Sequence, residues 1–348
     1  MAKLETRRAD MEALTGRQGE VLGRSRPYSI QQLEEDAFAA LIGDWDPMHN
    51  EPAWKFDAGW GGTIVLGFHV LSRAERFLRE CGVPARSDEE GTFMTLGIGR
   101  ARFMSPFPVG AEATCGVRLD SVEAGPDHLV IRTTLTNEYA GGPKPTMVAE
   151  HIGAFFWGRP SFTGILDDDE GPLIASIPSG TPIAPSAAHD EAFYAAVAAR
   201  AGQWLGTTPW TVVEQRDADA FAILSAGLDP LYNDRAWAAE HGPFGHTIVR
   251  PLQVLALRSY FMPQVGLPVL SDERMAAFNY GLDGVRWYAP VEPGTPMRDH
   301  VLLQAVTEKD PGRYLIRTLH LVEARGQDRA VLRADCSSMF VVSPPGGR

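Results

Sequence analysis

The chain has 348 residues, a formal net charge of -12 at pH 7 and 44% hydrophobic residues. This length exceeds that of a typical single domain, so two domains or one duplicated unit are expected. A net-acidic chain without a Lys/Arg cluster binds nucleic acid poorly, so no nucleic-acid partner is predicted. No stretch approaches the roughly 18 unbroken apolar residues of a membrane helix, and no membrane association is predicted either.

The cysteines and the N-terminal sequence indicate a compartment. Cys81, Cys115 and Cys336 are odd in number and widely separated. This pattern is typical of reduced thiols and argues against a disulfide framework or a cysteine-based metal site. The first residues are charged throughout and lack the apolar core of a signal peptide. A cytoplasmic location is therefore predicted.

The first expected helix leads to the groups of most chemical interest. Apolar residues at helical spacing predict a helix from Ser29 to Leu41, with Ser29 as its N-cap. Asp44 and His49 come next, and Pro47 between them indicates a loop on which both side chains can face one cleft. A carboxylate and an imidazole in one cleft are groups that an acid/base enzyme needs.

A second helix is predicted from Gly67 to Cys81, where a Gly/Pro stop signal follows. The N–H groups at its start have no partner inside the helix and point at whatever lies before it. Gly67 is thus a candidate donor to a substrate oxygen. Four segments with strand-like patterns then predict successive antiparallel strands, at residues 97–110, 113–122, 129–139 and 146–158.

The second half of the chain repeats the first. Residues 158–189, rich in Pro, Gly and Asp, are predicted to be a linker, and a helix is expected from Asp190 to Leu205. DAFAAL from Asp36 then recurs as DAFAIL from Asp219, an offset of 183 residues (219 minus 36). Further matches keep this register with single-residue gaps, which indicates an internal duplication of a unit of about 150 residues.

The duplication predicts how the units are arranged. A helix followed by about four antiparallel strands cannot cover both faces of its own sheet. The units 1–157 and 190–348 are therefore expected to pair as an intrachain pseudo-dimer. One continuous sheet would wrap around their long helices, Gly67–Cys81 and Leu252–Met262.

The two copies differ at the candidate chemical groups. The aligned pairs are Asp44 and Gly227, His49 and Tyr232, and Gly67 and Pro251. Proline has no N–H to donate, so all three groups are absent from the second copy. One active site is predicted, in the first copy, with the second copy contributing walls and space for the substrate.

Both halves resemble hotdog-fold units of the MaoC-like dehydratase family. The family signature is close to G-D-x-N-P-x-H, followed by a Gly-rich approach to G-[MF]-x-x-x-S. Here it stands as Gly43-Asp44-Trp45-Asp46-Pro47-Met48-His49, then Gly61-Gly62-Thr63-Ile64-Val65-Leu66-Gly67-Phe68, ending at Ser72. The segment NYGLDGVRWYAPVEPG, residues 279–294, resembles the NodN-type branch. The resemblance covers nearly everything except the linker and the first residues, and implies an α+β double hotdog.

The resemblance also implies an activity, the (R)-specific hydration or dehydration of a 2-enoyl or 3-hydroxyacyl thioester of CoA or an acyl carrier protein. Asp44 and His49 would activate one water, and the Gly67 N–H would hold the thioester oxygen. No metal or other cofactor is needed by this scheme. The partner would be a small acyl thioester, and the pseudo-dimer could pair further as a homodimer. Candidate pocket residues are Phe68, Gly227 and Tyr232.

Some polar residues stand apart from this pattern. Asp46 replaces the usual Asn, and a second carboxylate near Asp44 is expected to raise one of the two pKa values. His69 is expected to be a packed or capping residue. Arg102 and Arg286, matched in both copies, are expected to pair along a strand rather than bind CoA phosphates.

Two other functions remain open. In a double-hotdog thioesterase, water would attack the thioester carbonyl instead of C3, and release of free thiol would reveal it. In a non-catalytic acyl-binding partner subunit there would be no turnover. The Asp44/His49 box counts against both.

Overall fold

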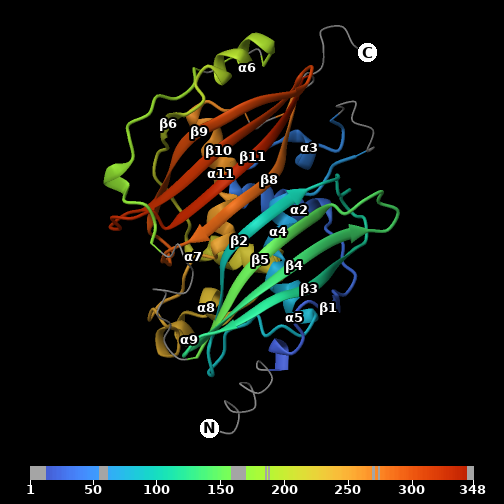
Figure 1. Ribbon diagram of the computed structural model, residues 1–348, viewed down its shortest axis with the longest axis vertical. Helices are drawn as coiled ribbons and strands as arrows, with labels where there is room; N and C mark the ends of the chain where they lie inside the picture. Colours follow the sequence, from blue (N-terminus) through green and yellow to red (C-terminus); the bar gives the residue numbers. More distant parts are fainter. Residues whose placement is uncertain are drawn as a thin grey trace.

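The computed structural model describes residues 13–54, 62–157, 170–184, 186, 189–268, 271–272 and 275–342. Its strands form one 11-stranded sheet (Figure 1) in the order β1-β3-β4-β5-β2-β8-β11-β10-β9-β6, with β7 paired to β9 beside this path. The strand pairs are antiparallel throughout the described part. The continuous antiparallel sheet expected from the sequence is confirmed.

Each copy contributes a matching set of strands. The first gives β1 (Val21–Arg24), β2 (Thr92–Phe103), β3 (Ala113–Ala124), β4 (His128–Tyr139) and β5 (Met147–Phe156). The second gives β6 (Gln203–Thr207), β7 (Thr211–Val212), β8 (Met275–Trp287), β9 (Pro296–Asp310), β10 (Arg313–Ala324) and β11 (Leu332–Val342). Strands β3, β4 and β5 confirm three of the four segments predicted after the second helix. The remaining one differs, because β2 begins at Thr92 and ends at Phe103 instead of spanning residues 97–110.

The helices repeat in the same way. The first copy has α2 (Gln32–Ile42), α3 (Pro47–Asn50), α4 (Gly67–Ser72) and α5 (Ala74–Glu80). The second has α6 (Glu191–Ala198), α7 (Gln215–Leu224), α8 (Pro230–Asn233), α9 (Arg235–Glu240), α10 (Pro251–Ala256), α11 (Arg258–Phe261) and the 3-10 turn η2 (Met262–Val265). A further 3-10 turn, η1 (Ile174–Ser176), lies in the predicted linker. Because α2/α7, α3/α8 and α4/α10 stand at aligned positions, the repeat in the sequence is a repeat of structure.

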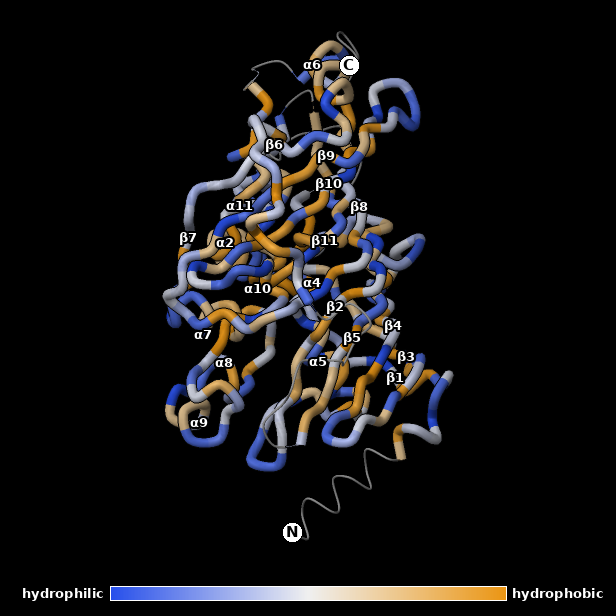
Figure 2. Tube along the Cα trace, turned by 60° about the vertical axis from the view of Figure 1, so that its left-hand side comes forward, coloured by the Kyte–Doolittle hydropathy of each residue, from blue (hydrophilic) through white to orange (hydrophobic). Residues whose placement is uncertain are grey.

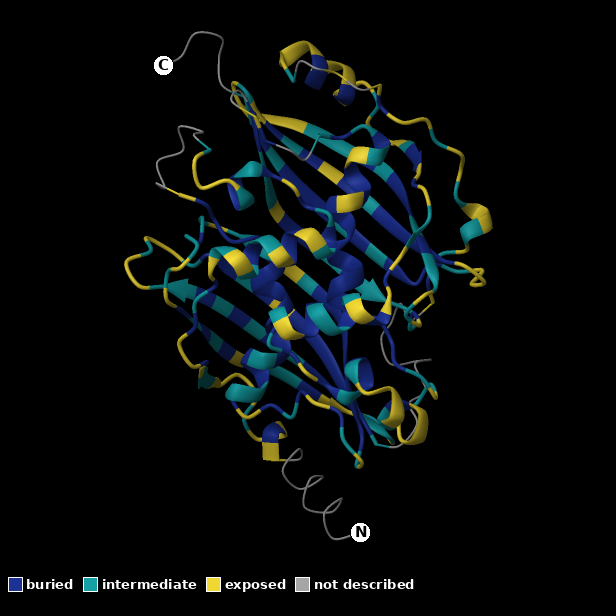
Figure 3. Ribbon diagram, turned by 180° about the vertical axis from the view of Figure 1, so that it is seen from behind, coloured by how far each residue is buried: buried dark blue, intermediate teal, exposed yellow. Residues whose placement is uncertain are grey.

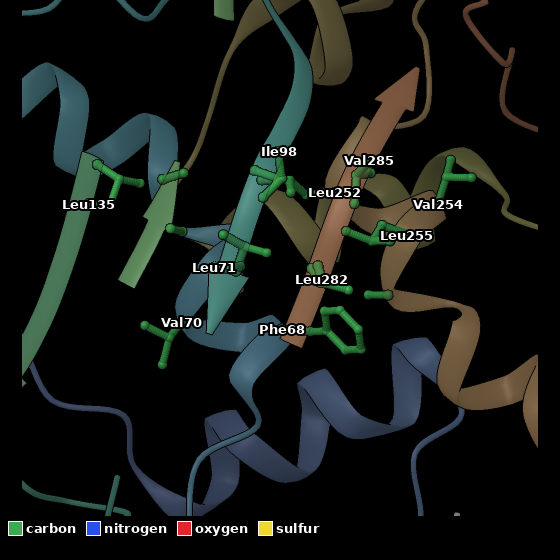
Figure 4. Packing of buried hydrophobic residues seen from close by; sticks show 14 of the residues in the cluster. Phe68, Val70, Leu71, Ile98, Leu135, Leu252, Val254, Leu255, Leu282 and Val285 are labelled. Carbon is green, nitrogen blue, oxygen red and sulfur yellow. The ribbon is translucent and has the colours of Figure 1, made fainter. Parts of the chain in front are cut away.

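The central helices of both copies pack against one face of the sheet. Seen from behind, they present exposed residues outward and buried ones toward the strands (Figure 3). Figure 2 shows that hydrophobic residues are concentrated in this interior, for example on α10. Burying one large apolar side chain contributes about 1.5–3 kcal/mol, so the shared core holds the copies together. The central side chains, drawn in Figure 4, include Phe68, Leu71, Ile98, Leu252, Leu255, Leu282 and Val285.

The seam between the copies is the β2–β8 pair. Arg286 lies opposite Gly97 and Arg102 lies opposite Gly281, so each arginine crosses the seam over a glycine of the other copy. A Cβ atom on Gly97 would come within 2.9 Å of the Arg286 guanidinium, and one on Gly281 within 2.8 Å of that of Arg102. Arg102 also forms a salt bridge with Asp283, at 2.8 Å. The expected role of these arginines in strand pairing agrees with this geometry.

The long helices are each broken once. The predicted helix Gly67–Cys81 is interrupted at Arg73, and Leu252–Met262 is interrupted at Leu257. At Arg73 the backbone N–H bonds to the carbonyl of Val70, three residues back instead of four. This tightens the turn before the next helix starts.

The other helix limits also differ from the prediction. The first helix begins at Gln32 rather than Ser29, because Gln31 and Glu34 form a capping box there. In the segment predicted as a helix from Asp190 to Leu205, α6 ends at Ala198 and the chain then forms strand β6. Gly202 lies between them with a φ of 82°. This left-handed conformation ends the helical path.

The predicted linker is described only in part. Residues 158–169 lie outside the described residues, as does Gly61 of the Gly-rich approach. Residues 170–184 lie along the second copy, where the N–H of Ile174 bonds to the Asp328 carbonyl and that of Ile183 bonds to the Val265 carbonyl. The limits of the two units stay a prediction. Among the described helices, none has the length and apolar character to cross a membrane.

Candidate active site

The segment after α2 forms a short helix rather than the predicted open loop. Helix α2 ends at Gly43, whose φ of 69° turns the chain sharply. Asp46 is then the N-cap of α3, accepting from the Met48 N–H at 2.9 Å, and Pro47 occupies its first position. Proline fits this position because it has no N–H to lose there. His49 is thereby carried on one rigid helical turn.

The ring of His49 has a defined orientation. Its Nδ1 lies 2.7 Å from the carbonyl oxygen of Ile64. A carbonyl only accepts, so Nδ1 carries the hydrogen, and Nε2 of the neutral ring is left as a proton acceptor. The side chain is mostly buried and lines a cavity. His49 therefore has the tautomer that a general base requires.

A polar brace supports this turn from α2. The Gln32 amide donates to the His49 carbonyl at 2.7 Å, and its oxygen accepts from the Thr63 hydroxyl. The same brace exists in the second copy, where Gln215 donates to the Tyr232 carbonyl at 2.8 Å. Because the brace persists where the histidine does not, its function is to hold the backbone.

Asp44 is held beside the same turn. It is 5% exposed, and its carboxylate accepts from the Asp46 N–H at 3.2 Å. The Asn50 amide donates to the backbone carbonyls of Asp44 and Asp46, at 3.2 Å each. Among the described residues, Asp44 makes no direct hydrogen bond to His49 and does not line the cavity. Among the described residues, the two predicted catalytic residues thus lie close in the chain without a hydrogen bond between them.

The cavity beside His49 has a volume of about 720 Å³. Its wall is mainly apolar and comes from both copies, so it lies across the pseudo-dimer as expected for a shared pocket. The first copy contributes among others Met48, His49, Ile64, Gly67, Val70 and Phe103. The second contributes among others Phe278, Asn279, Tyr280, Arg313, Met339 and Val341.

Gly67 occupies the position predicted for the donor. It is the first residue of α4 and lines the cavity. A Cβ atom here would lie 2.6 Å from the Phe103 ring, so only glycine lets the helix start this close to β2. Among the described residues, its N–H makes no hydrogen bond to another protein group. That N–H is available to a ligand in the cavity.

Asp46 joins the two copies. One carboxylate oxygen caps Met48, and the other accepts from the backbone N–H of Ser271 at 3.0 Å and from its hydroxyl at 2.7 Å. The second copy repeats the clamp in reverse, since Asp229 accepts from the Ser87 N–H at 2.7 Å. A carboxyl group can serve donors on both oxygens, whereas an Asn amide has only one acceptor. This explains the departure from the usual Asn.

The environment of Asp46 changes its titration. Burial is the main cause of a rise in the pKa of Asp46 from 3.8 to about 6; a protonated His49 opposes this rise, and the charge of Asp44 contributes to it. The expected pKa perturbation therefore falls on Asp46, with burial as its main cause.

Replacing Asp46 by Asn is expected to lower the free energy of unfolding by about 1–3 kcal/mol at pH 4. Both oxygens of the protonated carboxyl group can still accept, whereas the single amide oxygen of Asn leaves the N–H of either Met48 or Ser271 without an acceptor. The pKa of Asp46 rises from 3.8 to about 6 on folding, so the folded state binds more protons between these values, and ionisation lowers wild-type stability as the pH rises. The gap between the two proteins then narrows by roughly 1.4 kcal/mol per pKa unit. Urea unfolding at pH 4, 5 and 7 measures this, and a gap that widens with pH would contradict it.

His69 lies in the first turn of α4 and is fully buried. Its Nδ1 lies 2.8 Å from the Glu35 carboxylate, its Nε2 lies 3.2 Å from the Leu224 carbonyl, and its ring stacks on Phe38. The second Glu35 oxygen accepts from the Leu66 N–H at 2.6 Å. His69 is thus a packed residue, as expected, and ties α2, α4 and α7 together.

The aligned region of the second copy is filled by an ion pair. Arg250 bonds to Glu75 of the first copy at 2.5 Å, with both side chains about 3% exposed. Its guanidinium lies 4.1 Å from the centre of the Tyr232 ring. The cavity that corresponds to the one at His49, lined by Pro251 among others, holds only about 20 Å³. In the described part of the second copy, a cavity of this volume is too small for a substrate.

The predicted pocket residues need correction, since none of Phe68, Gly227 and Tyr232 lines the large cavity among the described residues. Phe68 points into the shared core (Figure 4). Tyr232 is fully buried under Arg250, and a Cβ atom on Gly227 would lie 3.3 Å from the Arg250 guanidinium carbon. The space left by Gly227 is taken by Arg250, which the alignment did not reveal.

Replacing Gly227 by Leu is accordingly expected to lower Tm, because the leucine side chain would displace Arg250 from Glu75. If position 227 instead faced open space, Tm would stay close to that of the wild type. Thermal unfolding of both proteins separates the two outcomes.

Sequence reasoning missed part of the second copy's contribution to the site. Asn279, Tyr280 and Arg313 line the cavity although none aligns with a catalytic group. The sequence contained one indication that Asn279 is functional. Asn279 begins the NodN-like segment and stands where the first copy has Thr95.

Comparisons with known proteins agree with the architecture. The chain is 30% identical over 148 residues to nodulation protein N of Rhizobium leguminosarum bv. viciae, which is 42% of this chain and 91% of that protein. It is 30% identical over 147 residues to 3-hydroxyacyl-thioester dehydratase Z of Mycobacterium tuberculosis, or 41% and 92% of the two chains. No family model matches.

Solved structures match over nearly the whole chain. A MaoC-like dehydratase superposes with a TM-score of 0.62 at 16% identity, covering 95% of this chain and 100% of that one. A Mycobacterium tuberculosis protein described as a double hotdog has a TM-score of 0.59 at 15% identity, covering 93% and 96%. The relatives correspond in length to one unit, whereas the structural neighbours correspond to both. The chain therefore belongs to the MaoC-like dehydratase family, with two hotdog units in one polypeptide.

Proposed function

We propose that the protein adds water to the C2=C3 bond of a 2-enoyl thioester, or removes it from the (R)-3-hydroxyacyl thioester, at a single site in the first copy. The observation that carries this proposal is His49. Its Nδ1 is fixed by the Ile64 carbonyl, so Nε2 is an acceptor at a large cavity. An imidazole held by Nδ1, with Nε2 facing a mostly apolar cavity, suits proton removal from water.

Asp44 is proposed to share the water with His49. The pair removes one proton from the water, whose oxygen bonds to C3 as the C2=C3 π electrons shift toward the thioester carbonyl. The same proton then passes from the pair to C2, and the carbonyl reforms. The reaction adds H and OH to the alkene and returns both side chains to their initial state.

Gly67 is proposed to stabilise the charge that develops on the thioester oxygen. Its N–H is at the helix start, lines the cavity and has no protein acceptor among the described residues. A donor placed where negative charge develops typically contributes about 2.7–4 kcal/mol to transition-state stabilisation. Pro251 at the aligned position has no N–H, which supports one functional site per chain.

The substrate class is supported by the cavity and by a relative. A volume of about 720 Å³ lies in the range of small-molecule sites, and its mostly apolar wall suits an acyl chain. The 3-hydroxyacyl-thioester dehydratase of Mycobacterium tuberculosis is named for this chemistry. We therefore propose a thioester of CoA or of an acyl carrier protein as substrate.

The test is a spectrophotometric assay over a panel of enoyl-CoA substrates, with a thiol reagent in parallel samples. Loss of the enoyl-thioester absorbance without thiol release is the expected result. Thiol release at the same rate would identify a thioesterase. Binding of acyl-CoA without turnover across the panel would indicate a non-catalytic acyl-binding subunit.

A further inference from the structure

Asn279 lies on the wall of the large cavity although it belongs to the copy without catalytic groups. It sits on β8 at a bulge, where Asn279 pairs with Ser338, Gly281 pairs with Ser337, and Tyr280 is the extra residue. Bulges next to binding sites re-aim side chains. Asn279 and Tyr280 both line the cavity, as do Ala277 and Phe278 before them on the strand.

The orientation of the Asn279 amide follows from its partner. The Arg258 guanidinium, buried on α11, lies 2.8 Å from Asn279 Oδ1 and 2.6 Å from the Ser338 hydroxyl. Arginine has only donors, so the atom facing it must be the amide oxygen. The Nδ2 group then lies on the side of the amide away from Arg258. Among the described residues, it makes no hydrogen bond to a protein group.

We propose that Asn279 Nδ2 donates a hydrogen bond to an oxygen of the acyl thioester, with Arg258 as the residue that positions it. This inference rests on the proposed function for the identity of the ligand. According to this proposal, the second copy contributes a specific polar contact with the substrate as well as part of the apolar wall of the cavity.

The first copy shows that this arrangement is special to the site with His49. Asn279 aligns with Thr95, whose hydroxyl lies 3.3 Å from the Glu75 carboxylate and 3.0 Å from His151. Thr95 lines the small cavity of about 20 Å³ at the second-copy position. Arg258 aligns with Ala74, so no guanidinium stands at that position. The oriented amide occurs where there is room for a substrate.

The decisive variant is Asn279→Asp. An aspartate keeps an oxygen toward Arg258 and strengthens that contact, but it removes the donor. If Asn279 served only to hold Arg258, the variant would bind ligand as the wild type does. If Nδ2 contacts the substrate, affinity for butyryl-CoA, which cannot be dehydrated or hydrated, is expected to fall about 10- to 100-fold, as for loss of one hydrogen bond in a site left with an unpaired acceptor.

Calorimetric binding of butyryl-CoA and of free CoA, with KM and kcat for crotonyl-CoA, measures the effect. A loss for butyryl-CoA alone is the expected result and places the contacted oxygen at the thioester. Equal losses for both ligands would place it in the pantetheine arm and contradict the proposal. Thr95→Val is the matched control, expected to change affinity less than about twofold. KM is expected to rise more than kcat falls.

Unchanged affinity of Asn279→Asp for both ligands would overturn the proposal, as would the absence of butyryl-CoA binding to the wild type. These outcomes differ from failure of the proposed reaction. In that case the wild type would bind butyryl-CoA and still leave crotonyl-CoA unchanged.

Discussion

Replacing His49 by Ala is expected to lower kcat/KM by about 10²–10⁴-fold, because the only Nε2 acceptor on the cavity wall is lost from the described site. Asp44→Asn is expected to cause a loss of similar size, since the carboxylate that shares the water becomes a neutral amide. The double variant is expected to be little worse than either single one, because groups acting on one water fail together. Steady-state hydration of crotonyl-CoA measures all three.

His49→Asn is the matched control for stability. The Asn amide can still donate a hydrogen bond to the Ile64 carbonyl, as the His49 ring does. The variant therefore keeps this hydrogen bond and lacks the basic nitrogen. Activity is expected to be as low as in His49→Ala, with Tm closer to wild type. Independent, multiplicative losses in Asp44→Asn and His49→Ala would contradict their joint action on one water.

Replacing Arg250 by Met is expected to lower the free energy of unfolding by about 3–5 kcal/mol, because Glu75 would be left as an unpaired buried charge. The double variant Arg250→Met with Glu75→Met is expected to recover most of this loss, since neither charge then remains buried. Urea unfolding at pH 7 of the wild type, both single variants and the double variant gives the coupling energy.

A small effect of Arg250→Met would contradict the account of the second copy as a site closed by an ion pair. The expected loss of stability is not accompanied by a large change in substrate binding. Because Arg250 lies outside the large cavity wall among the described residues, KM for crotonyl-CoA is expected to stay within about twofold in the folded variant.

The architecture could be predicted from the sequence because the fold is encoded in two similar halves of the chain. The main strands and the helices α2, α3 and α4 of the first copy have counterparts in the second, so a weak pattern in one half is supported by the matching pattern in the other. The paired arginines and glycines at the β2–β8 seam are a case in which the repeat identified the residues, and the structure supplied the reason.

What the sequence could not give was which side chain fills a given space. Gly227 was expected to leave space for the substrate. The side chain of Arg250, 23 residues further on (250 minus 227), occupies that space. Likewise, apolar periodicity from Asp190 to Leu205 did not separate a helix from the strand after Gly202, because short apolar runs fit both.

The site was predicted best where its chemistry is local. His49 lies on the cavity wall, and the start of α4 at Gly67 is where the helix pattern put it. The contribution of Asn279 depends on a bulge and on Arg258 from another element, and such tertiary contacts leave little trace in a single sequence.

The central claim is that water attacks C3 of an enoyl thioester at the His49 site. The most direct measurement is turnover of crotonyl-CoA in ¹⁸O-labelled water, followed by mass spectrometry of the products. The account predicts one ¹⁸O in the 3-hydroxyl group of an intact (R)-3-hydroxybutyryl-CoA, formed by the wild type and not by His49→Ala. Label in the carboxylate of a released acid, or equal labelling by His49→Ala, would contradict it.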